Sequence, residues 1–279
     1  MGKLPNVLEL DQIGEGEYRV RHPDRPPEER DVVFGGQLLA QMIMASDRAC
    51  GGSKDVKSIH AIFARAGTYQ EPIILRVEPI QAGRTWASDT VTAMQGERLL
   101  SRALILLNAD EPDIMRHAPA MPEVPGPEDL SPGEGMAFPG VELRMVPEPP
   151  DAPGGVPALL FWHRYPDKIN SVAANDAVLA WGTNGFLIGL AMRPHREQVD
   201  ISQAHRTLST GVIAHTLHFH ERFDVSQWLL VVQEALYAGR GRVHGRGLVF
   251  TRDGQLVATF GQDSMARKIE GELDYRRAM

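Results

Sequence analysis

The chain has one cysteine, no excess of positive charge and no long apolar run, and each shortage excludes a class of protein. Because Cys50 is the only cysteine among 279 residues, no intramolecular disulfide can form, and a lone thiol favours a reducing, cytoplasmic location. The formal net charge of -7 speaks against a nucleic-acid partner, which requires a basic surface. No stretch approaches the ~20 apolar residues that cross a bilayer, and the N-terminal residues lack the apolar run of a signal peptide, so we expect no membrane span.

What the chain does contain is an ordinary globular composition, with an uneven distribution of proline. Hydrophobic residues make up 43% and charged residues 23%, which is typical of a chain with a packed core. Of the 20 prolines, 12 fall between Glu111 and Pro157. Proline excludes regular helices and central strands, so we predict a linker over 111–157. This linker separates an N-terminal domain over 1–110 from a C-terminal domain over 158–279.

The two predicted domains show the same order of elements. In the first, a helix over 36–49 precedes strand-like runs over 56–65, 73–80, 84–94 and 99–108. In the second, a short strand over 158–165 precedes a helix over 176–192 that ends before Pro194, and further runs follow over 212–220, 228–236, 241–250 and 256–266. Each half therefore reads as a helix followed by four strands in meander order.

An internal repeat supports this division. The spacing from Glu78 to Ala82-Gly83-Arg84 is the same as the spacing from Glu234 to Ala238-Gly239-Arg240. This match suggests that each Glu holds the Arg of its own copy. Gly96 matches Gly254 in the last hairpin of each half, and His60 matches His215. A helix followed by antiparallel strands favours an α+β fold in which the sheet wraps the helix.

Short motifs throughout the chain resemble the acyl-CoA thioesterase II family. They include Val33-Phe-Gly-Gly-Gln37, Ser58-Ile-His-Ala-Ile-Phe63, His215-Thr-Leu-His-Phe-His220 and Phe250-Thr-Arg-Asp-Gly-Gln-Leu-Val-Ala258. The resemblance implies a double hotdog, that is, two tandem helix-wrapped antiparallel sheets. It also implies hydrolysis of an acyl-CoA substrate to a free acid and CoA, with no metal or other cofactor, by a homodimer or higher homo-oligomer.

The family positions its attacking water with an Asp, a Thr and a Gln, and this chain keeps one of the three. By position the Asp falls on Asn184 and the Thr on Val212, while the Gln is present as Gln262. Asn184 cannot accept a proton as a carboxylate does, so the site is a modified one. Gly35, Gly36 and Gln37 at the start of the first helix are candidates for polarising the thioester carbonyl and binding the substrate, because the positive end of the helix dipole lies there.

Histidines on the strand over 212–220 offer an alternative base. Alternation along a strand predicts that His218 shares a face with Val212 and Ala214, whereas His215 points to the other face. His218 is then a candidate general base, and a zinc site that includes His215 is not expected. Apolar helix residues are candidates for an acyl pocket, namely Met42, Met44, Phe186 and Leu187. The basic run from Arg240 to Arg246 either meets the phosphates of CoA or protects a solvated strand edge.

Four hypotheses remain open on the sequence. The first is an acyl-CoA thioesterase with a modified water-positioning set. The second is a non-catalytic acyl-CoA-binding protein, since the carboxylate is missing. The third is a hotdog hydratase, which the absence of an Asp-x-Asn-x-x-His pattern disfavours, and the fourth is a scaffold protein.

Overall fold

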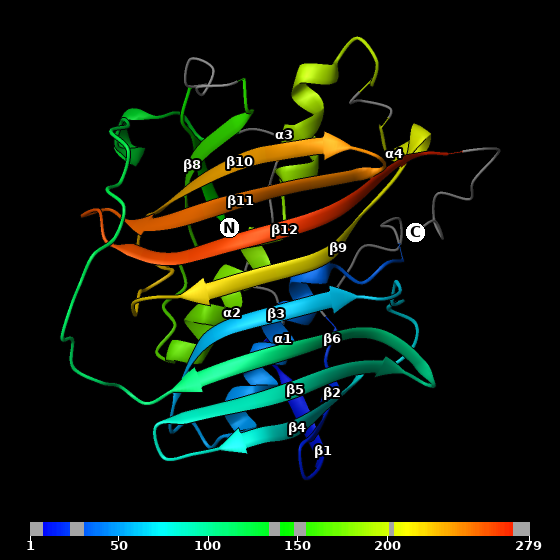
Figure 1. Cartoon of the computed structure of the whole chain (residues 1–279), viewed down its shortest axis with the longest axis vertical. Coiled ribbons are helices and arrows are strands. Elements are labelled where there is room, and N and C mark those ends of the chain that lie inside the picture. The colour runs from blue at the N-terminus through cyan, green and yellow to red at the C-terminus, as the bar shows by residue number, and fades with distance from the viewer. Residues whose placement is uncertain (1–7, 23–30, 134–139, 148–154, 201–203, 270–279) are drawn as a thin grey trace.

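A single antiparallel sheet of twelve strands runs through the part of the chain that the structure describes (Figure 1). The computed structural model describes residues 8–22, 31–133, 140–147, 155–200 and 204–269. The strand order is β1-β2-β4-β5-β6-β3-β9-β12-β11-β10-β8-β7. The strands span Leu10–Gly14 (β1), Glu17–Val20 (β2), Asp55–Phe63 (β3), Ile74–Ala82 (β4), Trp86–Gln95 (β5), Arg98–Asn108 (β6), Glu142–Met145 (β7), Ala158–Arg164 (β8), Leu208–Phe219 (β9), Leu229–Gly239 (β10), Arg242–Thr251 (β11) and Leu256–Lys268 (β12).

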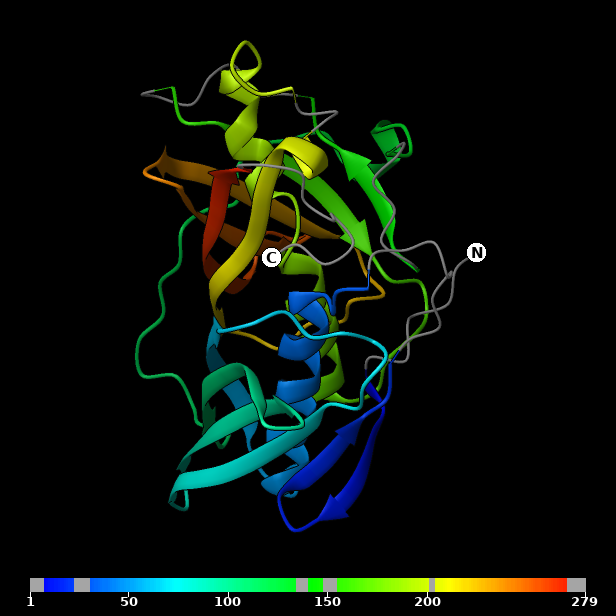
Figure 2. The same ribbon diagram turned by 90° about the vertical axis from the view of Figure 1, so that its right-hand side faces the viewer.

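The predicted α+β class is confirmed, but the two predicted sheets are joined into one. The central strands β3 and β9 pair antiparallel, from Ser58 opposite His218 to Ile62 opposite Ala214. This pairing makes one continuous surface that curves around the two long helices (Figure 2). The halves therefore share a backbone hydrogen-bond ladder in addition to a common core.

The predicted meander order of four strands is wrong in both halves. β3 pairs with β6 rather than with β4, and β9 pairs with β12 rather than with β10. Only the last three strands of each set form a meander, namely β4-β5-β6 and β10-β11-β12. Residues 64–73 carry the chain from β3 past β6 and β5 to β4, and residues 220–228 carry it from β9 past β12 and β11 to β10. These two crossings leave β3 and β9 free to pair with each other.

Two strand regions were not anticipated. The hairpin β1-β2 extends the sheet beyond β4, with Tyr18 and Val20 turned into the core. β7 lies within the proline-rich segment and forms the opposite edge of the sheet, beside β8. An edge is the place in a sheet that a proline-rich segment can occupy, because one side of the strand needs no ladder hydrogen bonds.

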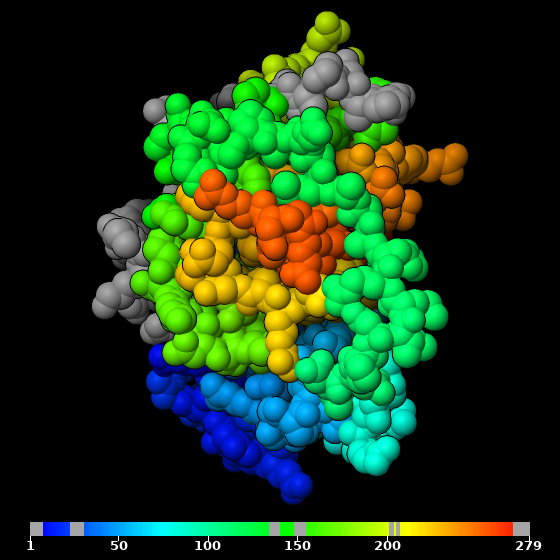
Figure 3. Space-filling view, turned by 90° about the vertical axis from the view of Figure 1, so that its left-hand side faces the viewer, coloured from blue at the N-terminus to red at the C-terminus, as the bar shows by residue number. Residues whose placement is uncertain are grey.

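The described part of the proline-rich segment packs on the second half of the chain (Figure 3). The indole Nε1 of Trp162 donates to the carbonyl oxygen of Pro125 at 3.0 Å. Arg252, in the turn between β11 and β12, pairs with Glu128. Parts of the predicted linker, residues 134–139 and 148–154, lie outside the described residues. The domain boundaries at 110 and 158 stay a prediction.

The single helix predicted over 176–192 is two helices. After α1 (Gly35–Ala49), the chain forms α2 (Val172–Thr183) and α3 (Leu187–Met192), with shorter turns η2 (Pro127–Asp129), η3 (Arg193–His195) and α4 (Ala204–Thr207). The Ser171 hydroxyl caps α2 by accepting from the Ala174 amide at 3.3 Å, which places the start earlier than predicted. Phe186 has a φ of 66°, a conformation that no regular helix contains, and this residue separates α2 from α3.

The two long helices touch at a glycine. A Cβ atom on Gly36 would lie 2.5 Å from the carbonyl oxygen of Trp181, so only glycine permits this approach. On the preceding residue, a Cβ on Gly35 would lie 2.9 Å from Asn184 Oδ1. The first turn of α1 is thereby held against the last turn of α2.

We predict that Gly36→Ala destabilises the fold. The added methyl group must push α1 away from α2, and overpacking of this kind costs about 1–3 kcal/mol. Urea unfolding of the two proteins measures the difference. Gly189→Ala is the matched control, because Gly189 is a helical glycine with no atom within 4 Å of its Cβ position. That substitution is expected to be neutral or stabilising, since Ala is favoured over Gly in helices by roughly 0.5–1 kcal/mol. Equal stability of both variants would contradict a tight contact at Gly36.

Candidate functional site

A cavity of about 280 Å³ lies where α1 begins and α2 ends. Four segments line it: the approach to α1, the end of β3 with the loop after it, the α2–α3 junction, and the start of β9. The lining residues are Val32, Val33, Phe34, Gly35, Leu38, Phe63, Arg65, Ala66, Gly67, Asn184, Ile188, Thr210, Gly211 and Val212. Three residues predicted from the sequence, Gly35, Asn184 and Val212, therefore meet at one cavity although they are distant along the chain.

A bulge in β9 turns Val212 toward this cavity. Ala214 pairs with Asp263 and Val212 pairs with Ser264, so Ile213 is an extra residue without a partner on β12. Directly paired residues share a face of the sheet, and Ser264 is fully buried. Val212 therefore lies on the inner face with His215, whereas strict alternation placed it with His218. The predicted common face of Val212 and His218 is wrong because of the bulge.

His218, the alternative base, lies on the outer face of the sheet. Its ring meets that of His60 edge to face, with 5.2 Å between the ring centroids. Burial, followed by the nearby His60, lowers the pKa of His218. Gln262 on β12 pairs with His215, so its side chain faces inward. The β12 partner of His218 is three residues away from Gln262, and this odd spacing puts the two on opposite faces of the sheet. The sheet itself thus separates His218 from Asn184 and Gln262.

Gln262 lies in a buried hydrogen-bond network that joins β12, β9 and α2. Its Nε2 donates to Ser264 Oγ at 3.0 Å, and its Oε1 lies 3.2 Å from His215 Nδ1. The other ring nitrogen of His215, Nε2, lies 3.2 Å from Thr183 Oγ1. With Oε1 of the amide facing the ring, His215 carries its proton on Nδ1 and donates it to Gln262. The Nε2 lone pair then faces the hydroxyl of Thr183, the residue before Asn184.

His215 remains neutral inside this network. The side chain is fully buried, and loss of solvation lowers its pKa to about 4, although the hydrogen bond to Gln262 opposes the shift. A neutral ring with its proton on Nδ1 supplies the donor that Gln262 Oε1 requires. The single hydroxyl proton of Thr183 has two acceptors within reach, the Ala180 carbonyl oxygen at 3.0 Å and His215 Nε2 at 3.2 Å. Neither His215 nor Thr183 was predicted as a site residue. The one sequence signal was the place of His215 in the internal repeat.

Asn184 has a hydrogen-bonding group without a partner. The residue is 4% exposed, and its Nδ2 has no hydrogen-bond partner among the described residues. The first turn of α1, which lies beside it, has no side-chain cap. The leading N–H groups of a helix have no partner within the helix and carry partial positive charge. The start of α1 therefore offers hydrogen-bond donors beside Asn184, whose Oδ1 is the atom nearest to Gly35.

The other predicted residues lie outside this cavity lining. Gly36 packs against the backbone oxygen of Trp181, as described above. Gln37 donates from Nε2 to Gln41 Oε1 at 3.3 Å and lies 3.2 Å from His22 Nδ1. Gln262 lies behind the wall, on the strand that pairs with the one bearing Val212. The four proposed acyl-pocket residues Met42, Met44, Phe186 and Leu187 belong to the core or pack against it, and none of them lines this cavity.

Two arginines of the basic run, both on β11, form ion pairs within the protein. Arg242 binds Asp263 at 3.0 Å and Arg246 binds Glu234 at 2.7 Å, so Glu234 holds Arg246 rather than the expected Arg240. β11 lies between β10 and β12, so the reading of this run as a strand edge is wrong, whereas the reading as a site for CoA phosphates stays a prediction. Among the described residues, no group of three or more His, Cys, Asp or Glu side chains is placed to hold a metal ion. No described helix is long and apolar enough to cross a bilayer.

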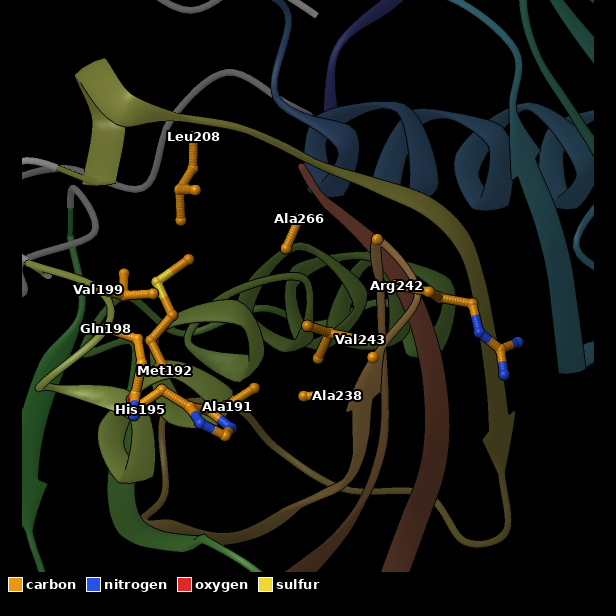
Figure 4. Close-up of a pocket in the computed structure, with 12 residues that line it drawn as sticks. Ala191, Met192, His195, Gln198, Val199, Leu208, Ala238, Arg242, Val243 and Ala266 are labelled. Carbon is orange, nitrogen blue, oxygen red and sulfur yellow. The ribbon is translucent and has the colours of Figure 1, made fainter. Parts of the chain in front are cut away.

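A second cavity of about 310 Å³ lies further along α3 and β9 (Figure 4). Met192, Leu208, Val243 and Ala266 give it apolar walls, and His195, Gln198 and Arg242 contribute polar groups. α3 and β9 contribute to both cavities, through Ile188 and Val212 in the first and Met192 and Leu208 in the second. Gly241, Arg242 and Val243 of the basic run line the second cavity, and none of the predicted catalytic or carbonyl-polarising residues does.

Comparison with known proteins gives consistent matches over both halves. Residues 22–107 match the acyl-CoA thioesterase N-terminal domain, and residues 115–266 match the acyl-CoA thioesterase C-terminal domain. The chain is 27% identical to acyl-coenzyme A thioesterase 8 of Mus musculus, over 95% of this chain and 88% of that protein. It is 26% identical to acyl-CoA thioesterase 2 of Haemophilus influenzae, over 96% and 98% of the two chains.

Solved structures show the same architecture. The acyl-CoA thioesterase II TesB2 from Mycobacterium marinum superposes with a TM-score of 0.81 at 26% identity, over 95% of this chain and 98% of that chain. A hot dog fold protein from Alicyclobacillus acidocaldarius superposes with a TM-score of 0.75 at 18% identity, over 95% and 98% of the two chains, which supports the fold alone. The predicted double hotdog fold is confirmed.

We predict that the His215 ring stays neutral from pH 8 to pH 5. The chemical shift of its Hε1 proton, followed by NMR and assigned with a His215→Gln variant, should not titrate over this range, because the folded-state pKa is about 4. In urea the same ring should titrate near the ordinary value of ~6.5. The unfolded chain takes up this proton at higher pH than the folded chain, so His215 lowers the free energy of unfolding as the pH falls from ~6.5 toward 4. A midpoint above pH 6 in the folded protein would contradict the buried neutral network.

Proposed function

The chain belongs to the acyl-CoA thioesterase family, and we propose that it hydrolyses an acyl-CoA thioester to a free acid and CoA through a modified water-positioning set. The observation that carries this proposal is the cavity at the junction of α1, α2 and β9. It brings together the start of a long helix, Asn184 and Val212, which are the positions that the family resemblance assigns to the chemistry.

The start of α1 is suited to polarise the thioester carbonyl. Its uncapped N–H groups offer hydrogen bonds to an oxygen that gains negative charge as water adds to the carbonyl carbon. Gly35 lines the cavity, and its lack of a side chain lets a substrate approach the backbone closely. When the tetrahedral intermediate collapses, the carbon–sulfur bond breaks and CoA leaves as a thiolate, which takes up the proton that the water loses.

Activation of the water is the weak step at this site. Asn184 orients a water through its amide but cannot take its proton, and Val212 has no hydroxyl. Gln262 lies behind the cavity lining, where it donates a hydrogen bond to Ser264. Ser264 is in turn the β12 residue that pairs with Val212. His215 is neutral but is fully buried and faces Gln262 and Thr183. We therefore propose slow hydrolysis, or hydrolysis restricted to particular thioesters.

The same residues favour one alternative, a protein that binds acyl-CoA without turnover. The specific observation is that Asn184 and Val212 leave the cavity without a carboxylate or a hydroxyl at the two positions where the family resemblance expects them. Turnover separates the two proposals, since both predict binding. The homo-oligomeric state and the cytoplasmic location stay predictions from the sequence.

We predict that Asn184→Asp combined with Val212→Thr raises turnover well above either single change. The carboxylate and the hydroxyl would act on one water, so their effects are expected to be coupled rather than additive. General-base assistance contributes about 10²–10⁴-fold, which sets the scale of the gain. Thiol release from acyl-CoAs of several chain lengths measures the rate, and Gln262→Ala in the wild-type background should lower it.

Two results would count against this assignment. One is a fast wild-type enzyme whose rate does not respond to Gln262→Ala, which would place the chemistry elsewhere. The other is a double variant that folds and binds acyl-CoA yet stays inert. Far-UV circular dichroism and a urea unfolding curve for each variant control for loss of structure.

A further inference from the structure

The start of α1 lacks the side chains that usually order the beginning of a helix. Phe34 stands at the N-cap position, where a side-chain oxygen normally accepts from the first turn, and its phenyl ring offers none. Gly35 and Gly36 follow, and glycine restricts the backbone less than any other residue. The amides proposed to polarise the thioester carbonyl therefore belong to a segment with little stiffness of its own. A fixed direction for them has to be imposed by contacts from outside the helix.

The amide of the N-cap residue is satisfied by a tyrosine from another segment. Gln37 is the third residue of α1, the position from which a Gln side chain can reach back to the N-cap N–H. Its Nε2 donates to Gln41 Oε1 at 3.3 Å and lies 3.2 Å from His22 Nδ1. The Phe34 N–H donates to the hydroxyl oxygen of Tyr69 at 3.2 Å. Tyr69 thus provides the hydrogen bond that a capping box would otherwise supply.

Tyr69 lies in the crossing loop, residues 64–73, which a buried glutamine attaches to the sheet. Gln95, at the end of β5, is 1% exposed. Its Oε1 accepts from the Thr68 amide at 3.1 Å, and its Nε2 donates to the carbonyl oxygens of Thr68 and Glu71 at 2.7 and 2.8 Å. The hydroxyl of Tyr69 is therefore presented to α1 from a loop whose backbone is fixed.

The crossing loop also holds the residues that lead into α1. The Tyr69 amide donates to Asp31 Oδ1 at 2.8 Å, and the Val33 amide donates to the carbonyl oxygen of Gly67 at 2.9 Å. Together with the bond from Phe34 to Tyr69, these contacts join the loop to three of the four residues that precede the helix. Both segments line the cavity, so the contacts also shape its wall.

Phe34 is held through both of its backbone polar groups. Its N–H is bound by Tyr69, and its carbonyl oxygen accepts from the amides of Gln37 and Leu38 at 3.0 and 3.4 Å. The Gly35 N–H belongs to the same planar peptide as this carbonyl and points in the opposite direction, away from the helix. Fixing Phe34 therefore fixes the direction of the Gly35 amide, and Gly35 lines the cavity.

We propose that Tyr69 is a positioning residue for thioester hydrolysis, whose hydroxyl sets the direction of the Gly35 amide toward the thioester carbonyl. This inference rests on the proposed function, because it assigns the Gly35 amide to the carbonyl oxygen. Tyr69 lies outside the cavity lining, so it acts through the backbone rather than by contact with the substrate. Its hydroxyl therefore contributes to the chemical step and not to substrate binding.

Tyr69→Phe removes the hydroxyl and keeps the ring, which meets the ring of His22 edge to face with 5.0 Å between the centroids. In assays of thiol release from octanoyl-CoA, kcat should fall about tenfold, because small misplacements of a group that acts on the transition state are costly. KM should stay within about twofold of the wild-type value, since the ground-state contacts remain. An unchanged kcat, or a tenfold rise in KM at constant kcat, would overturn the inference.

Tyr237→Phe is the matched control, because Tyr237 is an exposed tyrosine of β10 that does not line the cavity. It should keep the wild-type kcat and KM, and a fall in kcat equal to that of Tyr69→Phe would contradict a specific role of Tyr69. Asp31→Ala is a second variant, which releases the Tyr69 backbone and keeps the hydroxyl. Its kcat should fall at constant KM, so the inference stays testable if Tyr69→Phe does not fold.

The outcome for Tyr69 is separable from the outcome for hydrolysis, because amide NMR reports on the start of α1 without any thioester. Tyr69→Phe should speed hydrogen exchange of the Phe34 amide and shift the Gly35 amide resonance. These changes without thiol release by the wild type would support the positioning of the Gly35 amide and reject the proposed hydrolysis. Thiol release at the same kcat by the wild type and Tyr69→Phe would do the reverse. An unchanged NMR spectrum around Gly35 would overturn the positioning role whatever the rate.

Discussion

The close approach of α1 to α2 at Gly36 is the contact on which the candidate site depends. The backbone oxygen of Trp181 occupies the space that any side chain at position 36 would need. This contact holds the uncapped start of α1 against the end of α2, where Gly35 meets Asn184. The helices belong to different halves of the chain, so the site exists only because the two halves pack as one body around a shared sheet.

The central strands complete the site through an irregularity. The extra residue Ile213 in β9 reverses the alternation, so that Val212 faces inward on the same side as His215. His215 then connects Gln262 on β12 with Thr183 at the end of α2. This network is assembled beside the cavity, where Asn184 and Val212 stand at the positions for which the family resemblance predicts an Asp and a Thr.

The amide at Asn184 limits the chemistry proposed for the cavity. An amide cannot accept the proton of a water, and this argues for slow hydrolysis. Arg65 is the one charged side chain among the residues that line the cavity, so no lining carboxylate takes the place of the missing base.

The sequence alone determined which segments form the strands of the two repeats, the presence of two long helices, the repeat itself and the family resemblance. These properties depend on local periodicity, glycine and proline positions and short motifs, all of which are readable without partners. It also identified Gly35, Asn184 and Val212, which the structure brings to one cavity. The tertiary structure decided that β3 pairs with β6 and β9, that Ile213 forms a bulge and that Phe186 ends α2. It also decided that His215 is a buried neutral link between Gln262 and Thr183. Strand partners, register and burial depend on contacts between segments far apart in the chain, and local pattern does not specify such contacts.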